Sequence, residues 1–324
     1  MKEKLDRRTF LKRMTGMGVI VATSQLPVLA EDDPTVFPQR GRYERLALNY
    51  ATVNIGLEKP FSILHISDTH FTAAYSHEDE KKQTLRIKRT KTFGGRQEEA
   101  LRDSLAWAKT HVDYVVHTGD LIDWQSEANF DLVKKYFGEG MTGCLGNHEY
   151  SPSMWLSEVK AEGTEAYKDL SRKKLQSVYP FNIELQSQVV NGVNFVTLDD
   201  VYGYVTQSQV DLFKQEVRKG LPIVLCMHVP FHTENIWRVN VKFWKREAAK
   251  LSSAQVPDPT GDYRIQRQDP VTRDFIAYLK KEPLLKAILA GHLHFTMQDR
   301  FSPTAMEYVV GGNFLFHGEE ILFV

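Results

Sequence analysis

Five short apolar runs in this chain each stop at residues of the types that commonly bind metals, and this repetition constrains the fold more than any other feature. The runs have no helical period, as expected of strands buried on both faces. Each is followed by Asp, Asn or His, mostly beside Gly or Pro. The runs cover residues 61–67, 114–118, 141–145, 223–227 and 284–290.

Segments with a helical pattern separate the first three runs. A helix is expected over 97–110, where Leu101, Leu105 and Ala108 share one face, and another over 126–137. Strands joined by helices are expected to be parallel, so their carboxyl ends meet at one edge of a sheet. The residues that follow the runs are therefore expected to lie close together.

The second half of the chain adds antiparallel pairing. Asn191-Gly192 separates two strand-like segments, 181–189 and 193–198, and predicts a hairpin. Further helices are expected over 164–175, 206–218 and 271–281. An α/β chain with mixed pairing is thus predicted, as a single domain over 43–324 after a linker over 31–42.

Eight residues at the ends of the runs form a candidate site. They are Asp68, His70, Asp120, Asn147, His148, His228, His292 and His294. One such residue alone would usually cap a helix or pack in a core. Eight of them after five successive strands are poorly explained in that way, so we interpret them as one site. His65 and His117 lie inside strands and are expected to be packed and hydrogen-bonded instead.

These motifs resemble those of the calcineurin-like metallophosphoesterase superfamily. Its five blocks occur in order as Asp68-x-His70, Gly119-Asp120-x-x-Asp123, Gly146-Asn147-His148-Glu149, His228 and Gly291-His292-x-His294. The match runs from about Ser62 to Phe295. The resemblance implies two mixed β-sheets packed as a sandwich and flanked by helices.

The resemblance also implies two metal ions and seven ligands. The first metal would take Asp68, His70 and His294, the second Asn147, His228 and His292, and Asp120 would bridge both. Mixed oxygen and imidazole ligands suit Mn, Fe or Zn, as divalent or mixed-valence ions. Two such ions acidify a bridging water, so that hydroxide can attack the phosphorus of a small-molecule phosphomonoester or phosphodiester in line.

His148 and Glu149 are the catalytic residues that the resemblance implies. His148 would stabilise the transition state and protonate the leaving oxygen, and Glu149 would orient its imidazole and raise its pKa. Asp123 stands where purple acid phosphatases have a tyrosine, so their tyrosine absorption band is not expected. The alternative to an enzyme is a non-catalytic, metal-bound interaction scaffold of the same fold, but such members lack ligands or catalytic residues that this chain retains.

Two long segments are candidates for substrate contact. Residues 77–96 carry seven Lys/Arg, which could attract an anionic substrate or simply form a solvated face. Residues 231–268 are irregular and rich in aromatic and basic residues, and they are expected to form a lid rather than a disordered linker. Their Arg238, Arg246 and Arg264 are expected to contact substrate.

The first thirty residues are predicted to be an export signal. Asp6-Arg7-Arg8-Thr9-Phe10-Leu11-Lys12 resembles a twin-arginine motif, and an apolar stretch follows up to a cleavage point after Ala30. The expected partner is the twin-arginine export machinery, and the expected location is periplasmic or secreted. The alternatives are an uncleaved membrane anchor or a basic amphipathic helix. No other run approaches the ~18 apolar residues of a membrane span, so none is expected after processing.

Charge and cysteine content limit the remaining classes. Beyond residue 30 the chain has 35 Lys/Arg and 39 Asp/Glu, a balance that argues against a role in nucleic-acid binding. Cys144 and Cys226 are the only cysteines, and each lies on an expected buried strand. They are interpreted as core residues rather than as a disulfide or a nucleophile.

Overall fold

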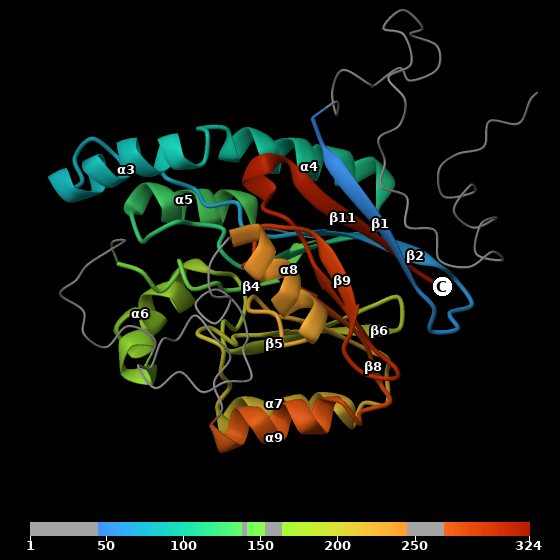
Figure 1. Ribbon diagram of the computed structural model, residues 1–324. Helices are drawn as coiled ribbons and strands as arrows, with labels where there is room; N and C mark the ends of the chain where they lie inside the picture. Colours follow the sequence, from blue (N-terminus) through green and yellow to red (C-terminus); the bar gives the residue numbers. More distant parts are fainter. Residues whose placement is uncertain (1–44, 138–140, 153–163, 245–268) are drawn as a thin grey trace, which may run out of the picture.

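Two mixed β-sheets pack face to face, with helices on their outer sides (Figure 1). The structure is a computed structural model that describes residues 45–137, 141–152, 164–244 and 269–324. The arrangement confirms the expected α/β fold of two sheets flanked by helices.

The first sheet has five strands in the order β1-β11-β2-β3-β4. These are β1 (Ala47–Val53), β11 (His317–Phe323), β2 (Phe61–Ile66), β3 (Tyr114–Thr118) and β4 (Met141–Cys144). All neighbours pair in parallel except β11 and β2. The last strand of the chain therefore lies between the first two, a position that the sequence pattern does not reveal.

The second sheet has six strands in the order β5-β6-β7-β8-β10-β9. These are β5 (Leu185–Val190), β6 (Val193–Leu198), β7 (Ile223–Cys226), β8 (Leu285–Ala290), β10 (Met306–Val309) and β9 (Met297–Arg300). The inner pairs are parallel and the two edge pairs antiparallel.

The predicted hairpin is confirmed, but it starts this second sheet rather than continuing the first. Asn191 and Gly192 have φ of 49° and 83°, the left-handed conformation that a two-residue hairpin turn requires. Hairpin chemistry selects the turn and the register. It does not select the sheet, because that choice depends on which sheet edge is free.

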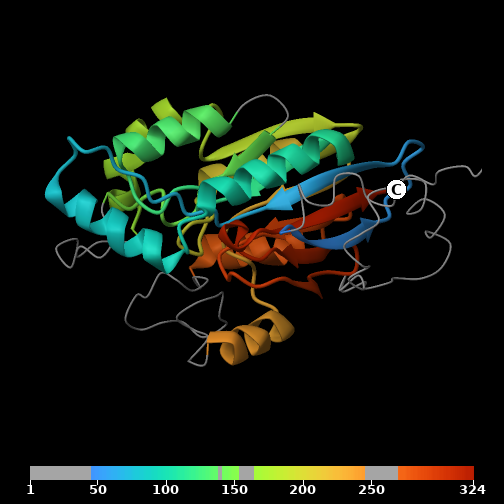
Figure 2. The ribbon, with the colours of Figure 1, turned by 90° about the horizontal axis from the view of Figure 1, so that it is seen from above.

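Helices cover both outer faces of the sandwich (Figures 1 and 2). On the first sheet lie α4 (Gln97–His111) and α5 (Glu127–Tyr136), with α6 (Glu165–Val178) packed against α5. Helix α3 (Glu80–Thr92) precedes α4 and extends beyond the strands (Figure 1). On the second lie α7 (Gln207–Val217) and α9 (Pro270–Leu279). Side chains of Ser126, Thr206 and Asp269 accept the free N–H groups at helix starts. No helix in these described ranges is long and apolar enough to cross a membrane.

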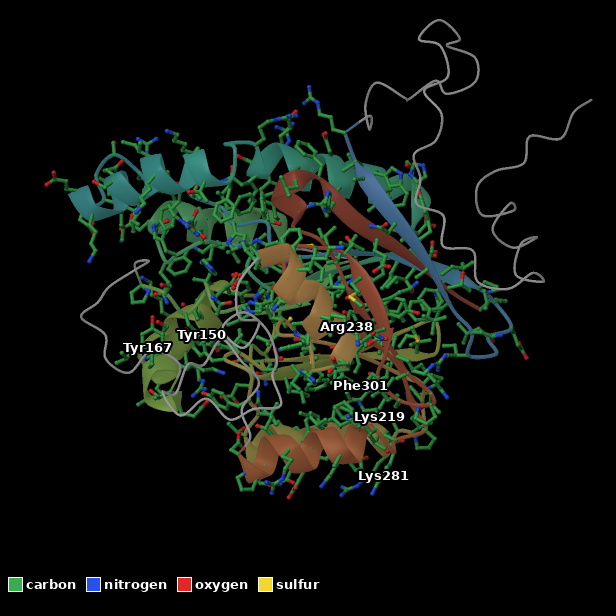
Figure 3. The ribbon with its side chains drawn as sticks, in the orientation of Figure 1. Tyr150, Tyr167, Lys219, Arg238, Lys281 and Phe301 are labelled. Atoms are coloured by element: carbon green, nitrogen blue, oxygen red, sulfur yellow. The ribbon has the colours of Figure 1, made fainter. Side chains whose placement is uncertain are left out.

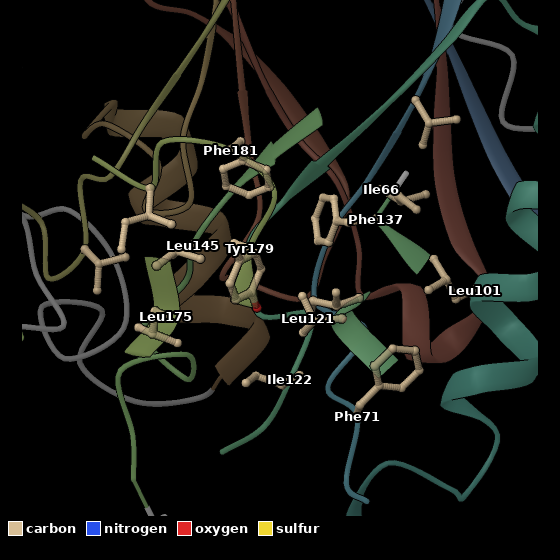
Figure 4. Close-up of a cluster of buried hydrophobic side chains, with 14 of the residues drawn as sticks. Ile66, Phe71, Leu101, Leu121, Ile122, Phe137, Leu145, Leu175, Tyr179 and Phe181 are labelled. Atoms are coloured by element: carbon tan, nitrogen blue, oxygen red, sulfur yellow. The ribbon is translucent and has the colours of Figure 1, made fainter. Parts of the chain in front are cut away.

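Separate apolar cores fill the layers. Between the sheets lie Ile63, Val116, Phe195 and Leu289, each of which is at most 1% exposed. A second core lies between the first sheet and its helices, where Figure 4 shows Phe137, Tyr179 and Phe181 gathered, with ring centroids 5.2–5.6 Å apart. Cys144 and Cys226 are buried free thiols, as expected of core residues.

The charged segment 77–96 contains a helix, α3, which its hydrophobic pattern did not reveal. Only Leu85 of this helix is buried, and it packs against Trp124. The helix forms because Asp79 caps its first turn and because Lys, Arg, Gln and Glu favour helix. Glu78 secures it by accepting backbone N–H groups of Glu127 and Ala128.

The expected lid segment is partly helical. Helix α8 (Glu234–Trp244) lies beside β9, the edge strand of the second sheet, and projects away from the sandwich (Figure 2). Residues 245–268 lie outside the described residues, as do the expected export signal and linker. The lid therefore stays a prediction.

Replacing Phe195 by alanine is expected to destabilise the sandwich by about 3–5 kcal/mol, the usual cost of removing a buried aromatic ring. Phe195 lies between the sheets, with its ring centroid 6.4 Å from Phe61 and 5.7 Å from Phe323. Chemical denaturation measures the loss. Val189→Ala on the neighbouring strand is the control, because Val189 is 51% exposed and should change stability by less than about 0.5 kcal/mol. Equal effects of the two substitutions would contradict this assignment of the core.

Candidate metal centre

The carboxyl ends of strands from both sheets meet at one place, and all eight residues of the candidate site lie there. Asp68 and His70 follow β2, Asp120 follows β3, and Asn147 and His148 follow β4 of the first sheet. The residues from the second sheet are His228 after β7 and His292 and His294 after β8. The site therefore spans the two sheets.

One cluster joins Asp68, His70 and His294. The Nε2 atoms of His70 and His294 are 3.1 Å apart, and Asp68 Oδ1 lies 3.2 Å from His294 Nε2 and 3.7 Å from His70 Nε2. All three side chains offer a ligand atom within 4.8 Å of the others. This group could hold one metal ion.

A second cluster joins Asp120, His228 and His292. His228 Nε2 lies 3.3 Å from Asp120 Oδ2 and 3.2 Å from His292 Nδ1. The same Asp120 oxygen lies 3.7 Å from His70 Nε2 of the first cluster. A single carboxylate oxygen thus reaches both clusters.

Two buried side-chain oxygens of the candidate site have no hydrogen-bond partner among the described residues. They are Oδ1 of Asp68 and Oδ1 of Asn147. A buried acceptor without a donor costs stability, and most such atoms have a partner. A cation would satisfy both, so the donor set fits metal ions at this site.

Five residues of the site have left-handed backbone conformations that non-glycine residues rarely adopt. Their φ values are 54° at Asp68, 53° at His70, 55° at Asp120, 68° at His292 and 59° at His294. Each left-handed residue costs of order 1 kcal/mol or more in folding free energy, and this conformation persists only where surrounding contacts enforce it. Hydrogen bonds between the turns supply such contacts, including His70 N to Asp120 O at 2.9 Å. Strain of this kind concentrates at functional sites.

A close backbone approach explains the glycine of the Gly146-Asn147-His148-Glu149 turn. A Cβ atom at Gly146 would lie 2.1 Å from Asp120 Oδ1, which no side chain could tolerate. The turn therefore comes close enough for His148 N to donate to that oxygen at 2.9 Å.

The electrostatics of the site favour positive charge. Burial lowers the pKa of His70 and His228, but neighbouring carboxylates outweigh it and raise these values to about 9 and about 10. Asp120 contributes to both shifts. The negative potential that holds protons on these rings would equally attract metal cations.

His148 is oriented by Asp123. Its Nδ1 lies 2.9 Å from Asp123 Oδ1 and 3.0 Å from Asp123 O, and its Nε2 points into the site, 3.9 Å from Asp120 Oδ2. Burial lowers the pKa of His148, yet Asp120 and Asp123 together raise it above its ordinary value. The ring is 15% exposed and can reach a bound molecule.

The expected contact of Glu149 with His148 is wrong. The Glu149 carboxylate instead accepts the backbone N–H groups of Gly146, Asp120, Leu121 and Ile122, at 2.7–3.2 Å. It also accepts the Tyr179 hydroxyl at 3.1 Å. Residues next to each other in a turn point in different directions, so adjacency in sequence did not bring these two side chains together. Glu149 fixes the turns after β3 and β4.

Arg89 and Phe93 belong to the site although the sequence interpretation did not include them. Arg89, on α3, binds the Asp123 carboxylate through Nε at 2.6 Å and Nη2 at 2.9 Å. Asp123 Oδ1 also lies 3.0 Å from His70 Nδ1. Phe93 stacks on the His70 ring, with centroids 4.3 Å apart. The only sequence signal was the basic run itself.

Two histidines inside strands and Arg238, one of the three arginines expected to contact substrate, are not part of the two clusters. His65 Nε2 bonds Thr118 Oγ1 at 2.9 Å, and His117 Nε2 bonds Thr69 Oγ1 at 3.0 Å, as expected of packed histidines. Arg238, labelled on α8 in Figure 3, is 69% exposed and pairs with Glu234 at 3.5 Å. Arg246 and Arg264 lie outside the described residues.

Comparison with known proteins identifies the family. The calcineurin-like phosphoesterase family matches residues 61–295, well over half of the chain. The chain therefore belongs to the calcineurin-like phosphoesterase family and is a metal-dependent phosphoesterase. The two clusters are consistent with the dimetal centre that this membership suggests.

Solved structures of similar fold are distant in sequence. A dimetal phosphatase from Danio rerio is 14% identical, with 78% of this chain and 88% of that one covered and a TM-score of 0.47. The calcineurin-like phosphoesterase YfkN from Bacillus subtilis is 12% identical, with 79% of this chain and 82% of that one covered and a TM-score of 0.35. A putative 5′-nucleotidase from Staphylococcus aureus is 12% identical, with 79% of this chain and 49% of that one covered and a TM-score of 0.38. No curated protein matches the chain.

Arg89→Met is expected to lower stability by roughly 2–5 kcal/mol, because it leaves the buried Asp123 carboxylate without its bidentate partner. Adding Asp123→Asn removes that charge, so the double variant should be less destabilised than the two single losses combined. Denaturant titration of the metal-free protein measures the free energy of unfolding of the wild type, the two single variants and the double variant. Arg86→Met is the matched control, since Arg86 is exposed on the same helix. A loss no larger than that of Arg86→Met would show that Arg89 does not anchor the site.

Proposed function

We propose that this chain hydrolyses small-molecule phosphate esters, monoesters or diesters, at a centre that holds two metal ions. The observation that carries this proposal is the position of Asp120, whose Oδ2 lies 3.3 Å from His228 Nε2 and 3.7 Å from His70 Nε2. Family membership supports phosphoester hydrolysis in general. The choice of ester rests on the residues around the centre.

The ligand assignment follows the two clusters. The first metal would be held by Asp68, His70 and His294, the second by Asn147, His228 and His292, and Asp120 would join both. Carboxylate, amide and imidazole donors together suit Mn, Fe or Zn. When bound, the two ions supply an acidified water as nucleophile and neutralise charge on the phosphoryl oxygens.

The chain's own catalytic contribution is proton transfer by His148. Its Nδ1 is held by Asp123, so its Nε2 faces the space beside Asp120. From that position Nε2 donates a proton to the oxygen of the departing alcohol. Asp123 fixes the ring and its tautomer, and Arg89 fixes Asp123. The role first given to Glu149 thus passes to Asp123.

Substitutions of the neighbours Asn147 and His148 separate binding from catalysis. His148→Ala should keep both metal ions and lose roughly 10²–10⁴-fold in kcat/KM, the usual contribution of a general acid. Asn147→Ala should weaken the binding of the second ion. Elemental analysis and metal titration measure occupancy, and p-nitrophenyl phosphate and bis-p-nitrophenyl phosphate measure turnover.

His77→Ala is the control for these variants, because the His77 side chain is 64% exposed and pairs with Glu127 on the surface. An empty metal site in a folded His148→Ala protein would refute the division of roles. A wild-type protein with two bound ions that hydrolyses no monoester or diester under several divalent metals would favour the non-catalytic scaffold.

Export by the twin-arginine route remains a proposal. It is supported by Arg7-Arg8 and the apolar stretch that follows them, and it would place the mature protein in the periplasm or outside the cell. An uncleaved form would stay anchored in the membrane.

Replacing Arg7 and Arg8 by lysine should leave full-length precursor in the cytoplasm, because the export machinery reads the arginine pair. Cell fractionation and the mass of the N-terminal peptide measure the outcome. Arg13→Lys serves as the control. Unchanged export of the Arg7→Lys/Arg8→Lys variant would exclude this route.

A further inference from the structure

Aromatic side chains form one side of the metal centre, next to His70 and His294. Phe93, just after α3, stacks on His70 at 4.3 Å with an angle of 11° between the rings. Phe314, in the short 3-10 helix η2 (Asn313–Leu315), stands edge-on to it at 4.8 Å and lies 5.3 Å from the His294 ring. These residues come from opposite ends of the chain.

Helix α8 extends the same side outward. Trp244 lies 5.9 Å from the His294 ring, and its Nε1 donates to Leu293 O at 3.3 Å. Phe243 lies 5.3 Å from Trp244 and 5.2 Å from Phe295. The helix is held there by Ile236, which is fully buried against residues after β8 and at the end of β10. Figure 2 shows that α8 otherwise stands free of the sandwich.

We define these five rings, Phe93, Phe243, Trp244, Phe295 and Phe314, as the aromatic wall. Their exposure increases with distance from the ligands. Phe93 is 6% exposed, Phe314 and Trp244 are half-buried, and Phe243 is 51% exposed. The wall therefore runs from the metal centre to the solvent.

Packing alone does not account for the exposed end of the wall. Aromatic rings that stabilise the sandwich, such as Phe195, are almost completely buried. A single exposed apolar residue such as Val189 is ordinary, but the 51% exposed Phe243 is contiguous with Trp244 and Phe295, and a contiguous apolar surface beside a site is typical of ligand binding. The one Lys or Arg bonded to a residue of the candidate site, within the described ranges, is Arg89, and it is engaged with Asp123. Arg89 is therefore used to hold Asp123 rather than to contact a substrate.

We propose that the substrate is a phosphate ester whose organic group carries a planar aromatic ring, which packs on Phe314 and Phe243 while the phosphate lies at the metal centre. This inference rests on the proposed function. Offset and edge-to-face packing favours aromatic over saturated rings of similar size. The ring can belong to an aryl group or to a nucleobase, and these two sources are separated by the substrates chosen below.

Two matched pairs of substrates test the proposal. Benzyl phosphate and cyclohexylmethyl phosphate differ in aromaticity and have similar leaving groups. Adenosine 5′-monophosphate and ribose 5-phosphate differ by the base. The metal-loaded protein should show kcat/KM about threefold to tenfold higher for the aromatic member of at least one pair. Calorimetric titration with benzylphosphonate and cyclohexylmethylphosphonate gives the same comparison without turnover.

Variants assign the preference to the wall. Phe314→Leu and Phe243→Leu keep apolar bulk and remove the ring, so they should abolish the preference, measured as the ratio of kcat/KM for the aromatic member to that for the saturated member. Phe314→Trp should retain it. Val189→Ala is the control, because Val189 lies on β5 near the hairpin, at the opposite ends of the strands from the centre. Melting temperatures verify that the variants fold.

The outcomes separate this inference from the proposed function. Hydrolysis without an aromatic preference, or a preference unchanged by the leucine variants, overturns the aromatic subsite and leaves the phosphoesterase proposal standing. No hydrolysis of any ester, combined with selective binding of benzylphosphonate that Phe314→Leu removes, overturns the proposed function and supports the subsite. Equal binding of the two phosphonates, together with equal kcat/KM for adenosine 5′-monophosphate and ribose 5-phosphate, overturns the subsite directly.

Discussion

The buried carboxylate of Asp120 is the group on which the arrangement of the centre depends. One of its oxygens lies within 3.3–3.9 Å of imidazole nitrogens of His228, His70 and His148, and the other accepts the His148 backbone N–H. A charge buried in this way is tolerated only with close positive partners. The residues after β2, β4 and β7 therefore converge on this one atom of Asp120, which itself follows β3.

Two further carboxylates beside the centre, Glu149 and Asp123, have different tasks. Glu149 accepts backbone N–H groups from two turns and so holds the main chain of Asp120 in its left-handed conformation. Asp123 bonds side chains, the imidazoles of His70 and His148, and is itself held by Arg89. Metal ligands in proteins usually depend on such supporting bonds for their orientation. Helix α3, almost wholly polar, is linked to the chemistry through Arg89 and, at its end, through Phe93, which stacks on His70.

The polar centre and the aromatic wall come from different parts of the fold. The ligands follow strands in the interior of the sandwich, whereas four of the five wall rings are contributed by the end of α3, by α8 and by η2. The fifth, Phe295, follows His294 after β8. A rigid strand-end constellation can serve many phosphate esters, and the surrounding segments then select among them. This division explains how a shared reaction can be directed to a particular organic group.

The sequence alone determined the strands, the turn between β5 and β6 and the residue types at the strand ends, because buried runs, Asn-Gly turns and Asp or His after a strand are local patterns. Only the tertiary structure decided that β11 lies between β1 and β2, that the hairpin starts a second sheet, and that Asp123 rather than Glu149 orients His148. It also decided that Arg89, 34 positions before Asp123, supports the site. These outcomes depend on which sheet edges are free and on where side chains point after a turn, and neither is encoded in a local stretch of sequence.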